Sequence, residues 1–248
     1  MKILLSPAKK LDFNKQGQQI KESTPFFLHK SEELIKVLKT KSEKQIGDMM
    51  KLSENLSSIN YERYQNFGSD KNPHKEAAFV FNGEVYTGLN AERLSEKELI
   101  FATNSLRILS GLYGILKPGD IIQPYRLEMG TKLKFKNNKN LYDFWGDEIA
   151  KFLNNEEQEL IINLASNEYN KAAKLKTLDA NIITPNFKEF KNGSYKTIMV
   201  YAKKARGAMA RWIIKNEVNK IDILKSFNQD GYCFNEELSN GNDWIFTR

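Results

Sequence analysis

Short apolar runs of the kind that form buried strands recur along the chain. They lie at residues 2–6, 77–81, 159–165 and 181–187, and polar residues or turn formers bound each run. Runs of about four to eight such residues are typical of strands, whereas helices need longer periodic segments. We therefore predict a strand at each of these places.

Helical spacing of apolar residues marks other segments. At residues 31–39 and 43–50, Leu, Ile, Val and Met recur at intervals that place them on one face of a helix. Residues 202–218 follow the same pattern, and we predict a third helix there. Its apolar side would carry Ala205, Met209, Trp212 and Ile213.

Asn-Gly pairs predict tight turns that join neighbouring strands. The chain contains three of them in positions that suit this role. They are Asn82-Gly83 before a short strand at 84–87, Asn192-Gly193 before one at 195–201, and Asn240-Gly241 between strands at 232–234 and 244–246.

Strands and helices are thus interspersed throughout the chain. We find no internal repeat, low-complexity tract or Pro/Gly-rich linker that would divide it. With 248 residues, of which 40% are hydrophobic, the chain can bury a substantial core. We expect an α+β fold (mixed α/β) in a single compact domain over residues 1–248.

Cysteine content and hydropathy restrict the location of the protein. Cys233 is the only cysteine, and no apolar run approaches the roughly 18 residues of a membrane span. The apolar run at the start is too short for a signal peptide. We expect a cytoplasmic protein without disulfides or membrane contact, and we favour a monomer.

The positive charge is concentrated in one quarter of the sequence. The chain has 38 Lys and Arg against 31 Asp and Glu, and residues 171–225 alone hold 13 of the former and four of the latter. Such an excess indicates a face that binds a polyanion. A solvated, lysine-rich surface is the alternative.

The predicted helix at 202–218 carries much of this charge. Lys204, Arg211 and Lys215 lie roughly opposite its apolar side, and Lys203 and Arg206 flank them. Cations at the start of a helix are disfavoured by its dipole, so their presence favours anion binding over a merely solvated surface. Gly207 lowers helix propensity by about 1 kcal/mol, which suggests a close backbone approach by a ligand or a neighbouring strand.

Seven short motifs occur in order between residues 5 and 207. They are LSPAK at 5–9, FNGEVYTGL at 81–89, LSGLYG at 109–114, QPYRLEMG at 123–130, FWGD at 144–147, NLASNEY at 163–169 and YAKKARG at 201–207. Each is weak alone, but their number and order argue against chance. Together they resemble the YaaA peroxide-stress family over nearly the whole chain.

The resemblance implies survival of hydrogen peroxide, with less unincorporated iron in the cell and less damage to DNA and protein. It also implies an unusual fold that binds DNA through a positively charged cleft and a helix-hairpin-helix element. Residues 56–60 followed by Arg63 have the frame of that hairpin, although Ser58 and Asn60 replace its two glycines around Ile59. Residues 111–117 are a rival, and an ordinary helix-loop-helix is the alternative.

Several motif residues could carry chemistry. Lys9, if desolvated beside another cation, could act as a nucleophile on a sugar carbon, with Glu128 or Glu168 moving the proton. Flipped bases could stack on aromatic residues. Simpler roles are an Arg126–Glu128 ion pair, a helix N-cap at Ser166 and a place in the core for the aromatics. The motif residues considered are Ser6, Lys9, Arg107, Tyr125, Arg126, Glu128, Ser166 and Glu168, with Tyr113 and Trp145 as further stacking candidates.

We therefore expect a DNA-binding protein whose partner is duplex, bent or partly opened DNA. An enzyme acting on a nucleic-acid base or nucleoside is the first alternative, and an adaptor for another acidic macromolecule is the second. We expect no cofactor and no metal site, because His29, His74 and Cys233 are widely separated. The candidate nucleic-acid contacts are Lys9, Ser58, Ile59, Asn60, Arg63, Arg107, Arg126, Lys203, Lys204, Arg206, Arg211 and Lys215.

Overall fold

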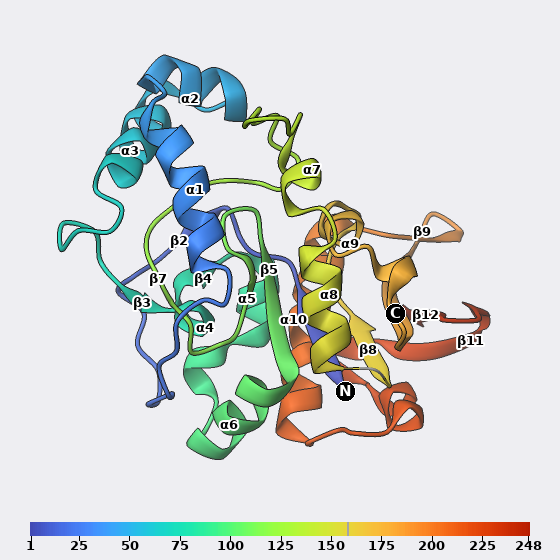
Figure 1. Ribbon diagram of the computed structural model, residues 1–248. Coiled ribbons are helices and arrows are strands. Elements are labelled where there is room, and N and C mark those ends of the chain that lie inside the picture. Colours follow the sequence, from blue (N-terminus) through green and yellow to red (C-terminus); the bar gives the residue numbers. More distant parts are fainter. Residues whose placement is uncertain (158) are drawn as a thin grey trace.

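A mixed sheet forms the centre of the computed structural model, which describes residues 1–157 and 159–248. β1 (Lys2–Leu5) lies in the middle of this sheet, parallel to β5 (Leu106–Ser110) on one side and to β8 (Leu160–Asn163) on the other. β6 (Gly114–Leu116) closes the β5 side as an antiparallel edge strand. Figure 1 shows the three central strands between the helices.

The sheet continues beyond β8 into the C-terminal part of the chain. β9 (Asn181–Lys191) is parallel to β8 and to β12 (Asp243–Thr247). β11 (Cys233–Asn240) and β10 (Ser194–Lys196) are antiparallel to β12 and β9, respectively. Two small sheets pair β2 (Lys10–Leu11) with β4 (Phe81–Asn82), and β3 (Lys75–Glu76) with β7 (Ile121–Ile122).

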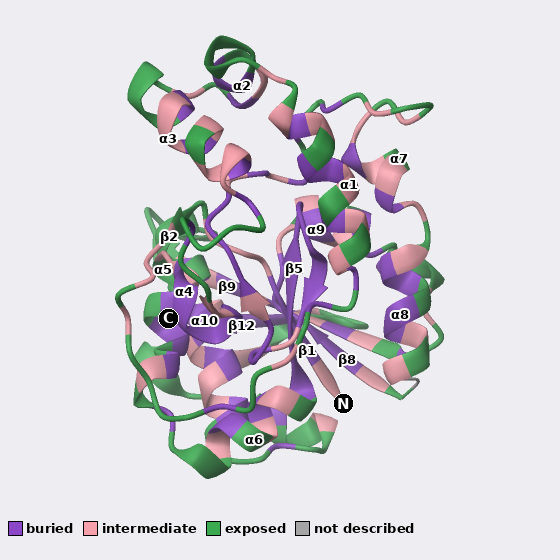
Figure 2. Cartoon of the chain, turned by 60° about the vertical axis from the view of Figure 1, so that its left-hand side comes forward, coloured by how far each residue is buried: buried purple, intermediate pink, exposed green. Residues whose placement is uncertain are grey.

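Helices cover both faces of the central strands. α8 lies on one face and α10 on the other in both ribbon views, while α2 and α3 stand apart from the sheet (Figures 1 and 2). The α-helices are α1 (Leu28–Lys39), α2 (Glu43–Met50), α3 (Glu54–Gln65), α4 (Ala77–Val80), α5 (Glu84–Leu89), α6 (Glu96–Ser105), α7 (Leu141–Trp145), α8 (Glu148–Glu156), α9 (Asn167–Ala172) and α10 (Met199–Lys215).

The central strands are buried on both faces, as Figure 2 shows. Ile3, Leu4, Leu5, Ile161 and Ile162 are fully buried. Parallel strands covered by helices on both sides need continuous apolar runs, because neither face meets water. The runs at 2–6 and 159–165 were of this type, and their prediction as strands is confirmed.

Helix predictions from apolar spacing are also confirmed. The segment 43–50 matches α2, which begins with a capping box between Ser42 and Gln45. The segment 31–39 falls within α1, and 202–218 largely coincides with α10. The turns at Asn192-Gly193 and Asn240-Gly241 join β9 to β10 and β11 to β12, as predicted.

Three strand predictions are wrong in whole or in part. Residues 77–80 form α4, and 84–87 belong to α5 because the chain enters a helix directly after Gly83. The strand expected at 195–201 ends at Lys196, and α10 begins at Met199. All three segments are short and apolar, so their periodicity does not distinguish a buried strand from a buried helical turn.

The hairpin expected around Ser58, Ile59 and Asn60 is also wrong, because these residues lie within the continuous helix α3. The Asn60 side chain donates to the Leu56 carbonyl at 2.7 Å and so stays within the helix. The turn lies before this segment, between α2 and α3. Lys51, with φ 53°, ends α2, and Ser53 caps α3. Lys51 therefore adopts the left-handed conformation that was expected at the glycine positions of the hairpin.

Candidate functional site

The order of strands reverses at β1. The chain places β5 on one side of β1 and later returns to place β8 on the other. Connections that leave such a point in opposite directions open a crevice beyond the carboxyl ends of the strands, where ligands of open α/β sheets bind. A pocket of about 410 Å³ lies there, beside Ser6 after β1 and Leu164 after β8. We call it the switch-point pocket.

Five segments distant in sequence line this pocket. All five overlap matched motifs: residues 6–10, 82–86, 125–128, the 164–169 segment that begins α9, and α10 through Lys203 and Arg206. Its charged lining residues are Lys9, Lys10, Glu84, Arg126, Glu128, Glu168, Lys203 and Arg206.

Of the candidate nucleic-acid contacts, Lys9, Arg126, Lys203 and Arg206 meet in this pocket, whereas Lys204 does not line it. Cations outnumber carboxylates in the lining, five to three. Lys9 Nζ lies 2.7 Å from Glu128 Oε2, and Arg126 Nη2 lies 3.2 Å from Glu128 Oε1. Glu128 is thus held by two cations, and the simpler interpretation of Arg126 and Glu128 as an ion pair is confirmed.

Lys9 does not have the surroundings proposed for a nucleophilic amine. Activation by desolvation requires burial, and its side chain is 65% exposed and ion-paired to a carboxylate. Glu168 is also engaged, because its Oε1 accepts a 2.8 Å hydrogen bond from the Gly130 amide. Glu128 and Glu168 remain the acid–base candidates of the pocket.

Two serines fix the floor of the pocket. The Ser166 amide donates to Ser6 Oγ at 2.8 Å, and the Ser6 hydroxyl lies 3.3 Å from Ser166 Oγ. Tyr86 OH donates to the Ser6 carbonyl at 2.9 Å. Ser166 occupies the N-cap position of α9, but its side chain makes no capping bond and contacts Ser6 instead. The serines thereby tie the end of β1 to the start of α9.

Arg206 is the least satisfied charged residue of the pocket. Within residues 1–157 and 159–248, no hydrogen-bond partner reaches its buried Nε. Burial lowers the pKa of its guanidinium, and no neighbouring carboxylate opposes this effect. A desolvated cation without a partner costs free energy that an incoming anion would recover.

The aromatic residues named for base stacking belong to the core. Tyr113, Tyr125 and Trp145 are at most 4% exposed. Tyr125 OH lies 2.7 Å from Ser110 Oγ, and Trp145 Nε1 donates to the Gly111 carbonyl at 3.0 Å. Burial raises the pKa of Tyr125, which stays neutral. Their burial favours the core role for these aromatics, although Tyr125 also lines the switch-point pocket.

Lys204, Arg211 and Lys215 line a separate hollow of about 520 Å³ on the other side of α10. The Arg211 guanidinium donates to the Leu89 and Asn90 carbonyls at 3.0 and 2.6 Å, so it caps the end of α5. Lys204 Nζ lies 3.2 Å from Asp230 Oδ2. The ridge predicted for α10 therefore exists, but it does not join the switch-point pocket.

Arg107 is a structural residue, and its assignment as a nucleic-acid contact is wrong. It is 2% exposed, and its Nη2 donates to Glu156 Oε1 at 2.8 Å. Arg63 is only partly buried, and its Nη1 lies 3.3 Å from Asn60 Oδ1 within α3. Neither residue lines the switch-point pocket.

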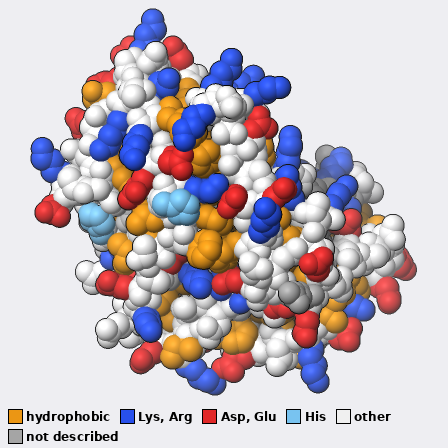
Figure 3. All heavy atoms as spheres, viewed as in Figure 1, with side chains coloured by type: hydrophobic (Ala, Val, Ile, Leu, Met, Phe, Trp, Pro, Cys, Tyr) orange, Lys and Arg blue, Asp and Glu red, His pale blue; other side chains and the backbone are white. Residues whose placement is uncertain are grey.

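The charge surplus of residues 171–225 is divided among separate hollows. Lys203 and Arg206 line the switch-point pocket, Lys204 and Lys215 the hollow beyond α10, and Lys171 a third pocket beside β9. In the space-filling view, Lys and Arg side chains are spread among Asp and Glu side chains and form no continuous patch (Figure 3). The sequence count therefore overstates any single basic face.

Some pocket residues were not singled out from the sequence. Lys10, Tyr86 and Tyr169 line the pocket together with the expected residues. Tyr86 and Tyr169 lie in the FNGEVYTGL and NLASNEY motifs, which were the available signal. In the described part of the chain, no group of three or more His, Cys, Asp or Glu residues could hold a metal ion. Nor does any described helix have the length and hydropathy to cross a bilayer.

Comparison with known proteins gives a consistent result over the whole chain. A family model described as "Peroxide stress protein YaaA" matches residues 1–238. Proteins described as "UPF0246 protein" are similar over 100% of this chain. One from Idiomarina loihiensis is 46% identical over 98% of its own length, one from Maricaulis maris 48% over 96%, and one from Flavobacterium psychrophilum 46% over 100%.

Proposed function

The chain belongs to the peroxide stress protein YaaA family, and we propose that it serves the peroxide stress response by binding DNA at the switch-point pocket. The observation that carries this proposal is the buried, partnerless Nε of Arg206 in a pocket with a surplus of cations. A DNA phosphate would supply the anion that this guanidinium lacks.

The neighbouring residues support a phosphate at this position. Lys203 precedes Arg206 by nearly one helical turn and lines the same pocket. Lys9 and Arg126 are held by Glu128 at the opposite wall, where a phosphate would compete with that carboxylate. Binding would then exchange one anionic partner for another. Neutralisation of phosphates by these cations releases counterions from the DNA, so the affinity should depend strongly on salt.

A second contact would come from the α2–α3 pair. Its turn, at Lys51, presents a cation next to the N-terminus of α3. Helix N-termini favour anions through their free amides and dipole. This turn takes the role that the resemblance assigns to a helix-hairpin-helix element.

The proposed effect on unincorporated iron is indirect. The described residues hold no cluster of His, Cys, Asp or Glu suited to a metal ion. Glu128 and Glu168 of the switch-point pocket are ion-paired or hydrogen-bonded to the chain itself. Protection of DNA during peroxide stress is the function that we assign to the pocket.

DNA binding is tested by anisotropy of a labelled duplex at several salt concentrations. We expect K203A/R206A to lose at least about tenfold in affinity, with a shallower salt dependence. K204A/K215A removes the same charge from the same helix on the side of the other hollow. We expect this control to stay within about threefold of wild type. Equal affinities of K203A/R206A and wild type would overturn the proposal.

An enzyme acting on a nucleobase or nucleoside is the second candidate. The location of the pocket at a switch point and its volume of about 410 Å³ favour a small ligand. Glu128 and Glu168 would then move protons, since Lys9 is exposed. Incubation with abasic and oxidised DNA, followed by analysis of released bases and cleaved strands, tests this candidate. Absence of a base or strand product counts against it.

A further inference from the structure

The face of β9 that points away from α10 is open along the strand. Side chains alternate between the two faces of a strand. Ile183 and Phe187 are buried on one face, where Phe187 packs against Phe227. The opposite face carries residues 184, 186 and 188, which are partly exposed, and ends with Phe190, which is 60% exposed.

Two aromatic rings lie together at this end of the strand. Phe190 pairs with Tyr195 across the β9–β10 hairpin, and their ring centroids are 5.1 Å apart in an edge-to-face arrangement. Tyr195 is 40% exposed. An edge-to-face pair stabilises a hairpin, but it also leaves ring surface free to stack with a planar ligand.

An amide-lined pocket of about 830 Å³ lies at the other end of the same face. Thr184 lines it and lies six residues before Phe190, a separation of about 20 Å along a strand. The buried Oδ1 of Asn170 faces no hydrogen-bond partner among residues 1–157 and 159–248. Side-chain amides both donate and accept, as nucleobase edges do. Five asparagines line this pocket: Asn163, Asn167, Asn170, Asn181 and Asn242.

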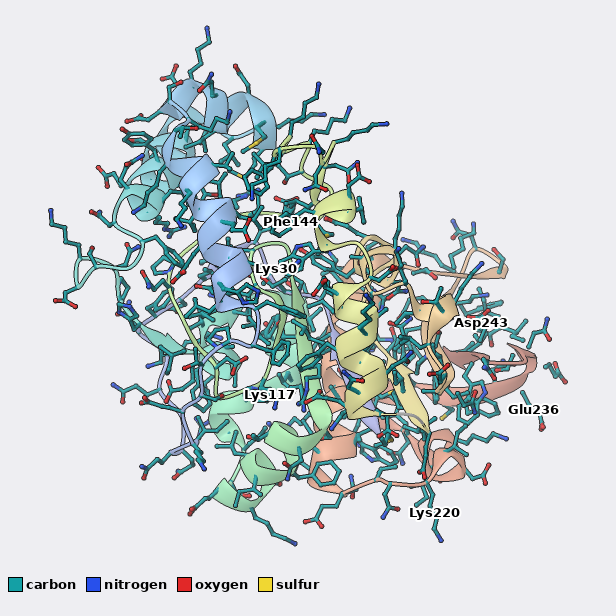
Figure 4. All side chains as sticks on the ribbon, in the orientation of Figure 1. Lys30, Lys117, Phe144, Lys220, Glu236 and Asp243 are labelled. Atoms are coloured by element: carbon teal, nitrogen blue, oxygen red, sulfur yellow. The ribbon has the colours of Figure 1, made fainter. Side chains whose placement is uncertain are left out.

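Charge along this face is positive on β9 and at the pocket. Lys188 lies between the pocket and the aromatic pair, and Lys171 and Lys176 line the pocket. Lys174 also lines it and is ion-paired with Asp147. The acidic residues Glu236 and Asp243 lie to one side, on the β11–β12 hairpin (Figure 4). A polyanion would therefore follow β9 rather than β12.

We propose that this face binds single-stranded nucleic acid. Bases stack on Phe190 and Tyr195, one base enters the amide-lined pocket, and the lysines contact the phosphates. A duplex does not fit this arrangement, because its bases are already stacked and paired. The inference rests on the proposed function in taking a nucleic acid as ligand, but its residues are separate from the switch-point pocket.

The test measures binding of labelled oligo(dT) and of a labelled duplex in parallel. We expect F190A/Y195A to lose about tenfold or more in affinity for oligo(dT) and to bind duplex like wild type. K203A/R206A should show the reverse. Because both rings are exposed, F190A/Y195A should lose only the small stabilisation of the edge-to-face pair and stay folded in thermal unfolding, and F190W/Y195F should retain oligo(dT) affinity.

The outcomes separate the two proposals. Unchanged oligo(dT) binding by F190A/Y195A, or no binding of oligo(dT) by wild type, overturns the single-strand face and leaves duplex binding at the switch-point pocket standing. If K203A/R206A loses oligo(dT) binding and F190A/Y195A does not, the single-strand face is likewise overturned. Binding of oligo(dT) through the aromatic pair without any duplex binding supports this face and overturns the proposed function.

Discussion

Gly88 of α5 and Gly207 of α10 lie against the backbone of each other's helix. A Cβ on Gly88 would come within 2.1 Å of the Lys204 carbonyl, and a Cβ on Gly207 within 1.7 Å of the Val85 carbonyl. The close backbone approach expected from Gly207 is thus present, with a helix as the neighbour. This crossing fixes the rotation of α10, and so directs Arg206 to the switch-point pocket and Arg211 to the end of α5.

Substitution of Gly207 by alanine should destabilise the protein. Alanine raises helix propensity by about 1 kcal/mol, but the new methyl group would collide with the backbone of α5. We expect G207A to lose about 2 kcal/mol or more in free energy of unfolding, measured in urea. The exposed Lys203 on the same helix provides the control, because K203A should stay within about 0.5 kcal/mol. A G207A variant as stable as wild type would contradict the close crossing.

Arg206 should lower the free energy of unfolding of the protein and raise its affinity for duplex DNA. R206M replaces a partly buried guanidinium, whose buried Nε has no hydrogen-bond partner among the described residues, by an apolar chain. We expect a gain of about 1 kcal/mol in free energy of unfolding, together with a loss of at least about tenfold in duplex affinity. Urea unfolding and anisotropy measure the two quantities. Loss of stability in R206M would show that the guanidinium is satisfied within the fold.

Arg107 should behave in the opposite way, because its charge is paired inside the protein. R107M would leave the partly buried Glu156 with Lys117 Nζ, at 3.4 Å, and the more distant charge of Lys2 for compensation. We expect a loss of about 3 kcal/mol in free energy of unfolding, with duplex affinity unchanged. The double variant R107M/E156M should recover most of this loss. Weakened DNA binding by a folded R107M variant would indicate that Arg107 contacts DNA.

The ion pair of Glu156 should make stability depend on acid pH. Burial alone would raise the pKa of Glu156, but hydrogen bonding and charge from Arg107 outweigh it and the pKa is lowered. Its stabilising effect is therefore complete above the unfolded pKa of about 4.3 and is lost as the pH falls through the lower folded value. The stability difference between wild type and E156Q should be largest near about pH 7 and shrink toward about pH 3. A constant difference would contradict this assignment.

Restoring a glycine at position 58 should not create a DNA-binding hairpin. Ser58 lies within α3, so S58G should cost about 0.5–1 kcal/mol through lower helix propensity. Duplex affinity should stay within about twofold. A gain in affinity in S58G would indicate that residues 56–60 form the turn when DNA is bound.

The sequence predicts an element best where the length of its apolar pattern and its burial in the fold indicate the same type of element. β1 and β8 follow from apolar runs in covered parallel strands, and α2 follows from apolar spacing with a serine cap. The segments 77–81 and 84–87 were mistaken because a single buried turn is as apolar as a strand. Asn82-Gly83 marks a change of direction, but this change leads into a helix.

The site is predictable in part for a similar reason. Residue type indicates which cations are available, and Lys9, Arg126 and Arg206 do meet in one pocket. Arg107 looks the same in sequence, and only the fold shows that Glu156 holds it. Lys204 and Arg206 are two residues apart, yet they face different hollows because α10 presents them on different sides.

Because β1 lies in the middle of the sheet, the chain can complete this part of the sheet only after later strands have been made. Ile3 pairs with Leu106 on one side and Ile162 on the other, so β1 needs partners that are made later in the chain. At about 5–20 residues per second, synthesis reaches β8 on the order of ten seconds after β1. Before β5 is made, the apolar side chains of β1 have no partner strand, and until β8 is made they have one on a single side. The three central strands can therefore pair completely only after β8 has left the ribosome.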